Sequence, residues 1–187
     1  MGSGAPIACD DKLVAIYRAP GRSLDIIGLW CERAQVPCMR CLILSDHVRP
    51  RDYCGSLVNV ITAYALLQEI AGEGHEGIIV TAGNSATGCA LASLARRRNV
   101  SAVFLVRSTA KEALQQQGAE HVIVTAEGDF ENRLGVLADE LGTTAVFDGV
   151  GGDLIGRIAP SLPMNSTIYF YGFLGGAVPV SLHHRPF

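Results

Sequence analysis

The residues best suited to bind a charged ligand lie in a short glycine-containing segment, Thr81–Gly88, which reads Thr-Ala-Gly-Asn-Ser-Ala-Thr-Gly. An apolar run, 77–81, leads into it, and a run rich in alanine and leucine, 86–98, follows. If these runs are a strand and a helix, the free N–H groups and the dipole at the helix start favour an anion. Gly83 and Gly88 would permit a tight turn and a close approach of helix and sheet. The segment predicts an anion-binding loop, with a purely structural turn as the alternative.

A second set of polar residues follows the next apolar run, 102–106. Arg107, Ser108 and Lys111 offer a guanidinium, a hydroxyl and an ammonium group, and the first carboxylate after them is Glu112. Domains that bind NAD carry an Asp or Glu at this point, about 20 residues after the first glycine, to hold the ribose hydroxyls. A cationic set suits a 2′-phosphate instead, because an arginine can bind phosphate through two N–H groups. The set predicts NADP(H), with solvated surface charges as the alternative.

Two further glycine-rich segments, Asp148–Gly152 and Tyr171–Gly176, also follow apolar runs. Glycines at these points let the backbone approach a bound nucleotide closely. We interpret Asp148 as a turn former rather than a base. Ser85 is not a candidate nucleophile, because no Gly-x-Ser-x-Gly elbow surrounds it. The sequence identifies no catalytic residue.

Apolar runs alternate with helix-like runs through the second part of the chain. Strands are predicted at 77–81, 102–106, 121–124, 145–147 and 167–171, and helices at 86–98, 109–117, 129–141 and 153–162. Because helical crossovers connect parallel strands, we predict an α/β fold with a doubly wound parallel sheet, the Rossmann fold. In such a sheet the ligand lies beyond the carboxyl ends of the strands, where the glycine segments fall. An earlier helix is expected from an N-cap at Asp52 to Ala71, ended by Gly72 and Gly74.

Composition is that of a folded protein without a bias toward polyanionic partners. Of the 187 residues 49% are hydrophobic and 18% are charged, with a net charge of −3. This balance predicts neither nucleic-acid nor membrane-surface binding. We find no apolar run of the roughly 18 residues needed to span a bilayer and no signal peptide. We expect a cytoplasmic protein, with a mitochondrial location left open.

The cysteines and histidines do not form a convincing metal motif. Cys38 and Cys41 have the spacing of a zinc knuckle, but a structural zinc site normally needs a second pair, which the sequence lacks. We expect buried, reduced thiols and no metal, with zinc as the minor alternative. His183 and His184 lie close to the end of the chain. No histidine triad is evident.

Several motifs in order resemble the cofactor domain of medium-chain dehydrogenases/reductases, and most closely the zinc-free branch of quinone reductases and enoyl thioester reductases. Asn59–Leu66 is similar to that branch's Asn-Pro-Leu-Thr-Ala-Tyr segment, and Gly28–Glu32 to a strand that ends the family's first domain. The other matching segments are Thr81–Gly88, Gly118–Ile123, Asp148–Gly152 and Tyr171-Gly172. Two departures are Val60 in place of proline and Ala86 in place of a glycine. The resemblance covers residues 28 to about 176.

The resemblance implies a domain division and a set of cofactor contacts. Residues 1–50 correspond to a partial segment, with remnant strands at 12–17 and 41–44, of the family's chaperonin-10-like catalytic domain, and residues 51–187 to the Rossmann domain. A family member is nearly twice as long, and Tyr17, Tyr53 and Tyr64 do not match the catalytic tyrosine of the enoyl reductases. We therefore expect a fragment or a truncated paralogue. The expected cofactor-binding residues are Asn59, Thr62, Gly83, Asn84, Ser85, Ala86, Thr87, Gly88, Arg107, Ser108, Lys111, Gly151, Gly172 and Phe173.

The expected function is that of an NADPH-binding domain in an oxidoreductase that passes hydride to a quinone or to an α,β-unsaturated carbonyl or thioester. The alternative is a non-catalytic nucleotide-binding or assembly module. The run 167–171 reads as the last strand of the sheet, with a further short strand expected within 177–182. Since exposed strand edges tend to pair, we expect a homodimer. A monomer whose tail folds over this strand is the alternative, and Pro179 argues for it.

Overall fold

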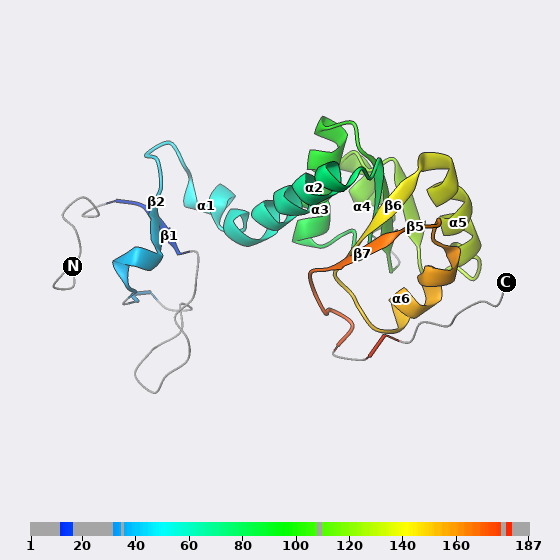
Figure 1. Ribbon diagram of the computed structural model, residues 1–187. Coiled ribbons are helices and arrows are strands. Elements are labelled where there is room, and N and C mark those ends of the chain that lie inside the picture. The colour runs from blue at the N-terminus through cyan, green and yellow to red at the C-terminus, as the bar shows by residue number, and fades with distance from the viewer. Residues whose placement is uncertain (1–11, 17–31, 35, 108–109, 177–178, 181–187) are drawn as a thin grey trace. The chain divides into compact units, whose positions relative to one another are not determined.

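The computed structural model describes residues 12–16, 32–34, 36–107, 110–176 and 179–180 (Figure 1). The chain divides into two compact units, Met1–Val58 and Asn59–Phe187. Ser108, Gly28–Trp30 and the two histidines at 183 and 184 lie outside the described residues. Most of the expected strand within 177–182 lies outside them too.

The first unit contains a small antiparallel ribbon. Strand β1 (Val14–Ile16) pairs with β2 (Cys41–Ile43), and Ala15 lies opposite Leu42. Both fall within the strand-like runs predicted at 12–17 and 41–44. A short helix, α1 (Pro50–Tyr53), follows, and its first turn begins with proline, whose missing N–H costs nothing there.

The N-cap prediction at Asp52 is wrong. The residue before α1 is Arg49, and Asp52 lies inside the first turn, where its carboxylate pairs with the Arg49 guanidinium at 2.6 Å. Pro50 explains the shift, because its fixed φ suits the first helical position. A π-helical turn (Ser56–Val60) then leads into α2 (Ile61–Glu73). This helix ends at Gly74, one of the two glycines predicted to end it, in a left-handed conformation with φ +81°. The other, Gly72, lies within its last turn, so the predicted end at Ala71 is two residues too early.

The second unit is built on a five-stranded parallel sheet in the order β5-β4-β3-β6-β7. The strands are β3 (Gly77–Val80), β4 (Ser101–Val106), β5 (His121–Val124), β6 (Thr143–Asp148) and β7 (Thr167–Phe170). The predicted α/β fold with a doubly wound parallel sheet is confirmed. The chain moves outward from β3 to β5 and then returns to start β6 on the other side of β3. This reversal places the switch point, where such sheets bind ligands, between β3 and β6.

Helices cover both faces of the sheet (Figure 1). The crossover helices are α3 (Ala86–Arg97), α4 (Lys111–Gln116), α5 (Phe130–Leu141) and α6 (Asp153–Ile158). The predicted helix at 153–162 is completed by a 3-10 turn, Ala159–Ser161. Gly118 and Gly142 end α4 and α5 with positive φ, as the sequence predicted.

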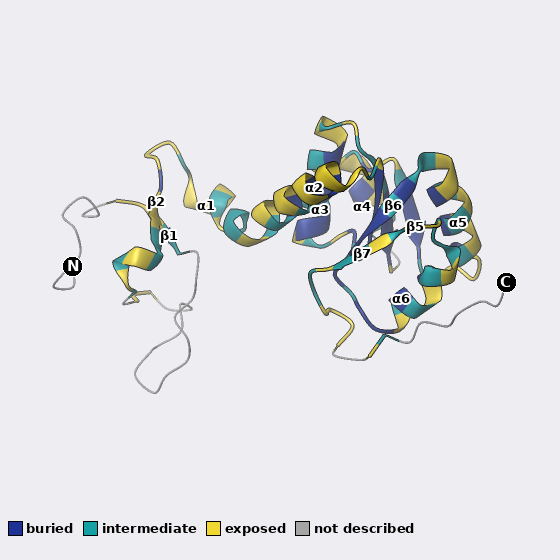
Figure 2. Cartoon of the chain, viewed as in Figure 1, coloured by how far each residue is buried: buried dark blue, intermediate teal, exposed yellow. Residues whose placement is uncertain are grey.

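Strand β3 joins two apolar cores, because its side chains alternate between the faces of the sheet. Ile78 and Val80 pack with residues of α2, α3 and α4, and Ile79 packs with residues of α5 and α6. All of β3 is buried, whereas the outer faces of the helices are exposed (Figure 2). A fully buried Phe, Leu or Ile contributes about 1.5–3 kcal/mol, so these cores hold the loops at the carboxyl edge in place.

One helical stretch, Pro50–Glu73, is long and apolar enough by length and composition to cross a membrane, and 17% of its most apolar window is buried. It is not an unbroken apolar run, since Arg51 and Asp52 lie near its start and Glu69 lies near its end. One such helix is weak evidence, because core helices of globular proteins meet the same criterion. We assign no membrane segment on this basis.

Candidate functional site

The loop between β3 and α3 forms a compact turn at the carboxyl edge of the sheet. The Ser85 hydroxyl caps α3 by accepting a hydrogen bond from the Gly88 N–H at 3.0 Å. Ala82 has φ +49°, a conformation that is uncommon for residues other than glycine. The Gly83 N–H donates to the Leu105 carbonyl at 2.9 Å, which ties the loop to the end of β4. The start of α3 therefore faces the space beyond the central strands.

Two glycines of this loop have no room for a side chain. A Cβ at Gly83 would lie 2.9 Å from the Phe104 Cβ. A Cβ at Gly88 would lie 2.2 Å from the Gly83 carbonyl oxygen and 2.8 Å from that of Ala82. Gly88 therefore packs against the backbone of its own loop, whereas Gly83 is the glycine that packs against β4. Both keep the loop in its turn.

A buried carboxylate joins this loop to the loop after β6. Asp148 is fully buried and accepts hydrogen bonds from the Thr81 hydroxyl at 2.5 Å and from the Val150 and Gly151 N–H groups at 3.0 and 2.8 Å. The Thr81 oxygen in turn accepts from the Gly149 N–H at 2.9 Å. These bonds within its own loop support the turn-forming role expected of Asp148. They also bind the ends of β3 and β6 together across the switch point.

The loops after β6 and β7 are joined by backbone hydrogen bonds. The N–H groups of Leu174 and Gly175 donate to the carbonyls of Gly149 and Val150 at 3.0 and 2.9 Å. A Cβ at Gly172 would lie 3.0 Å from the Gly149 carbonyl oxygen, so any side chain there would press on the neighbouring loop. The two predicted glycine-rich segments thus form one wall of the carboxyl edge.

A pocket of about 410 Å³ opens at this edge, a size typical of cofactor and ligand sites. Its residues come from the ends of β4 and β5, from all three glycine-containing loops and from α6. They are Ala82, Asn84, Ser85, Leu105, Val106, Arg107, Thr125, Val150, Asp153, Leu154, Arg157, Leu174 and Gly175. We call this the Arg107 pocket. Arg107 is exposed and, within the described part of the chain, has no ionic partner.

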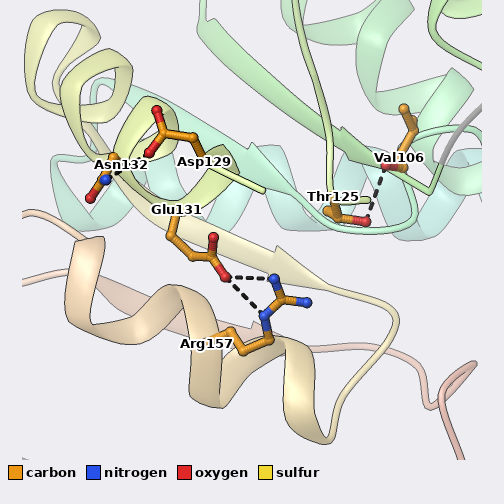
Figure 3. A network of polar contacts seen from close by, with 6 residues as sticks. All are labelled: Val106, Thr125, Asp129, Glu131, Asn132 and Arg157. Atoms are coloured by element: carbon orange, nitrogen blue, oxygen red, sulfur yellow. Dashed lines mark hydrogen bonds and ion pairs between the residues drawn. The ribbon is translucent and has the colours of Figure 1, made fainter. Parts of the chain in front are cut away.

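A second arginine of the pocket is held by an ion pair (Figure 3). The Arg157 Nε and Nη2 atoms donate to one oxygen of Glu131 at 2.9 and 2.6 Å, and the guanidinium carbon lies 4.5 Å from the centre of the Phe130 ring. Close by, Asn132 donates to Asp129 at 2.7 Å, and the Thr125 hydroxyl donates to the Val106 carbonyl at 3.2 Å. The Arg157–Glu131 pair therefore ties α6, which lines the pocket, to α5, which does not, and the Thr125 bond ties the end of β5 to the end of β4.

The structure brings only part of the predicted set into this pocket. Of the predicted cofactor contacts, Asn84, Ser85 and Arg107 line it. Lys111 lines a separate hollow with residues of α4, β5 and α5 and is not among the residues that line the Arg107 pocket. Ser108, the third member of the predicted cationic set, lies outside the described residues.

Two predicted contacts that are far apart in the sequence meet at α3. The Thr87 hydroxyl donates to the Asn59 side-chain oxygen at 3.0 Å. Thr62 follows in the first turn of α2 and is half-buried. Gly151 has φ +73° and is buried in the β6 loop, and Phe173 is 68% exposed in the β7 loop. Ala86 occupies the first position of α3.

Sequence reasoning missed several pocket residues, most of which follow β6 and β7. Val150 and Gly175 fall inside segments that were singled out for their glycines, so their position was a usable signal. Asp153 and Arg157 lie on α6 and had no local signal, because their approach to Arg107 depends on the order of the strands. Asp153 adds a carboxylate that the sequence placed in a helix without assigning it to the site.

The described cysteines do not gather with other metal ligands, and that part of the chain contains no group of three such side chains. Cys41 lies at the start of β2, and its thiol donates to the Pro37 carbonyl. Burial raises the pKa of the Cys89 thiol, in the first turn of α3, so this cysteine stays protonated at neutral pH. We assign no nucleophilic role to it.

No family model and no curated protein sequence matches the chain, but solved structures are similar to it. A protein from Mesorhizobium loti described as an NADPH:quinone reductase is 27% identical, with a TM-score of 0.71 over 77% of this chain and 42% of that one. One from Sinorhizobium meliloti described as an alcohol dehydrogenase is 19% identical, with a TM-score of 0.74 over 98% and 54%. The mitochondrial 2-enoyl thioester reductase heterodimer from Candida tropicalis is 19% identical, with a TM-score of 0.64 over 77% and 46%.

These structures are medium-chain dehydrogenases/reductases, so the predicted resemblance to that family is confirmed. Another of the similar enoyl thioester reductase structures is a complex with NADP and crotonyl-CoA. The chain spans about half the length of the structures that it matches.

Proposed function

We propose that this chain is the NADPH-binding portion of a zinc-independent oxidoreductase that reduces a quinone or an α,β-unsaturated carbonyl or thioester. The observation that carries the proposal is the Arg107 pocket, where the end of β4 presents a guanidinium and the start of α3 presents its N–H groups. The similarity to NADPH:quinone reductases and enoyl thioester reductases supports it.

The residues of the pocket fit a phosphorylated dinucleotide. Ser85 and Asn84 lie at the start of a twelve-residue helix, whose N–H groups suit a pyrophosphate. Arg107 lies at the position where NAD-specific domains carry a carboxylate, and a guanidinium there suits the 2′-phosphate of NADPH. Gly83 and Gly88 allow the loop to keep its tight turn, since a Cβ at either would clash with the loop or with β4.

NADPH would supply the hydride, and the protein would supply binding, orientation and electrostatics. In this arrangement Arg107 binds the phosphorylated ribose, the first loop binds the pyrophosphate, and the joined β6 and β7 loops hold the nicotinamide end. The hydrogen bonds between Asp148 and Thr81 and between Gly149 and Thr81 hold the loop after β3 and the loop after β6 at a constant separation. The reducible substrate would meet the nicotinamide against the catalytic domain of the complete enzyme.

The test is a fluorescence titration of the chain with NADPH and NADH, followed by turnover assays with a quinone and an enoyl thioester. We expect saturable NADPH binding, weaker NADH binding and no turnover by this chain alone, because one wall of a cleft neither orients the substrate nor excludes water. Absence of NADPH binding would contradict the proposal. A measurable rate from this chain alone would show that the catalytic residues are present in it. Binding without turnover by the full-length protein would favour a non-catalytic nucleotide-binding module.

We further propose that the chain forms a homodimer through the outer edge of β7. This strand ends the sheet, and its Phe170 side chain is 48% exposed. Edge strands present unpaired N–H and C=O groups that can extend a sheet across a two-fold axis. Light scattering at micromolar concentration should give the dimer mass. The Phe170→Asp variant should be a monomer, whereas Met164→Asp, which changes an exposed residue in the preceding turn, should stay dimeric.

A further inference from the structure

The phenol of Tyr171 is the one buried side-chain polar group that has no hydrogen-bond partner in the described part of the chain. Tyr169, two residues earlier, shows the usual arrangement, because its phenol donates to Glu73. Both rings pack against the same apolar core, on the face of the sheet covered by α2 and α3. A buried donor without an acceptor is unfavourable, so a native structure that keeps one calls for an explanation.

The surroundings of this phenol belong to the carboxyl edge of the sheet. A Cβ at Gly149 would lie 2.8 Å from the phenol oxygen, so glycine at this position makes the space for it. Burial raises the pKa of Tyr171, and the negative charge of Asp148 raises it further, although Ser85 lowers it. The phenol is therefore a neutral O–H donor at physiological pH. Ser85 is the neighbouring side chain that acts on this phenol, but the phenol has no complete hydrogen bond among the described residues.

Ser85 is also the residue that caps α3 and lines the Arg107 pocket. A serine hydroxyl has one hydrogen to donate and two lone pairs that accept. The Gly88 N–H already occupies one lone pair, at 3.0 Å. If the Tyr171 hydrogen occupies the second, the Ser85 hydrogen must point away from both neighbours, and the open direction is the pocket. A hydroxyl fixed in this way is a ready donor to an anionic oxygen.

We propose that Tyr171 is a positioning residue that acts through Ser85, directing the Ser85 hydroxyl toward a phosphate oxygen of the bound dinucleotide. This inference rests on the proposed NADPH-binding function. The phenol is unpaired among the described residues of the free chain, and its hydrogen bond to Ser85 would form when the dinucleotide binds. We call the two successive hydrogen bonds, from Tyr171 to Ser85 and from Ser85 to the phosphate, the relay. The relay changes no covalent bond, and each hydroxyl oxygen keeps its own hydrogen.

The experiment measures the affinity of NADPH for Tyr171→Phe, Ser85→Ala and the double variant, with Tyr169→Phe as the matched control. Loss of one hydrogen bond predicts about a fivefold weaker affinity for Tyr171→Phe. Tyr171→Phe should not change the NADPH affinity of the Ser85→Ala variant, because the hydroxyl through which Tyr171 acts is already absent. Tyr169→Phe should leave the affinity unchanged.

Two further readouts separate a relay from a structural role. The melting temperature of free Tyr171→Phe should equal or exceed that of the parent, because the removed hydroxyl is unpaired, whereas Tyr169→Phe should melt lower. Adenosine 2′-monophosphate, which lacks a pyrophosphate, should bind Tyr171→Phe and the parent equally by NMR titration. Arg107→Ala should weaken the binding of this probe.

Each result supports or overturns the relay. Equal NADPH affinity in Tyr171→Phe and the parent, or additive losses in the double variant, would overturn it and leave the proposed function standing. A lower melting temperature for free Tyr171→Phe would assign the phenol a structural role instead. Failure of the parent chain to bind NADPH at all would overturn the proposed function and the relay together.

Discussion

Polar side chains at the two ends of the parallel sheet differ in whether they have protein partners. At the amino end the His75 Nδ1 atom lies 2.7 Å from the Thr144 hydroxyl, and Glu73 receives the Tyr169 phenol and lies 3.5 Å from the His75 ring. Every one of these groups has a protein partner. At the carboxyl edge, within the described residues, the Tyr171 phenol has no hydrogen-bond partner and Arg107 has no ionic partner.

This difference separates groups that hold the fold together from groups that are free to meet a ligand. The His75, Thr144 and Tyr169 side chains already have protein partners, so a ligand could only compete with them. At the carboxyl edge the Tyr171 phenol and the Arg107 guanidinium are donors without such partners among the described residues, and an anionic ligand is the kind of group that would pair with them. The Asp148 and Thr81 network is the exception at that edge, because it is fully paired and links two loops.

The largest effect should come from Gly88→Val. Because a Cβ at this position would lie 2.2 Å from the Gly83 carbonyl oxygen, the first loop must move. We expect no NADPH binding at concentrations that saturate the parent, with helix and sheet content retained by circular dichroism, since overpacking costs about 1–3 kcal/mol. Gly72→Ala is the control, because it adds a Cβ in open space on α2, and it should bind normally. Normal NADPH binding by Gly88→Val would exclude the first loop as the phosphate site.

The next effect concerns the paired network at the same edge. Asp148→Asn replaces a carboxylate oxygen with an NH2 group that must face N–H donors, so we expect about 3 kcal/mol less stability in denaturant unfolding. Asp153→Asn, which changes an exposed carboxylate five residues later, should alter stability by less than about 0.5 kcal/mol. Equal losses in both variants would show that burial of Asp148 is not what makes its network important.

Arg107→Ala tests whether the arginine without an ionic partner at the carboxyl edge binds the 2′-phosphate. We expect NADPH to bind about 1.5–3 kcal/mol more weakly, the range for a hydrogen bond to a charged group, and NADH to be almost unaffected. Arg97→Ala removes the same charge at the far end of α3 and should change neither affinity. The two dinucleotides would be titrated in parallel at one salt concentration, because exposed charges are screened by salt. Equal losses for both would refute the 2′-phosphate assignment.

The smallest effect is a pH dependence at the amino end. Burial, and then the Glu73 hydrogen bond and charge, raise the pKa of Tyr169 to about 12, against about 10 for an unperturbed tyrosine. The stabilisation from this phenol is therefore complete below pH 10 and is lost as the pH rises from about 10 to about 12. We expect Tyr169→Phe to be about 1 kcal/mol less stable than the parent at pH 8. The difference in denaturant midpoint should narrow by pH 11. A constant difference across this range would contradict the shift.

Local pattern was enough to predict the elements of the second unit. Runs such as Ile78-Ile79-Val80 indicate buried strands because they are apolar on both faces, and Gly74 and Gly142 indicate helix ends because they adopt a left-handed conformation at low cost. Arg107 was found from its place at a strand end, since that position faces the ribose in this fold. These signals are carried by neighbours in the sequence.

What the sequence did not determine depends on which strands lie side by side. Asp148 meets Thr81, 67 residues away, only because β6 lies beside β3, and Arg157 reaches the Arg107 pocket only because α6 follows β6. Lys111, four residues after Arg107, was expected at the same phosphate; it is the first residue of α4 and lines another hollow together with residues of β5 and α5. The sequence alone determined the alternation of strands and helices, the glycines at which α2, α4 and α5 end, and the glycine-containing turn between β3 and α3. The tertiary structure decided which side chains line the Arg107 pocket and which donors stay unpaired among the described residues, because both depend on contacts across the sheet.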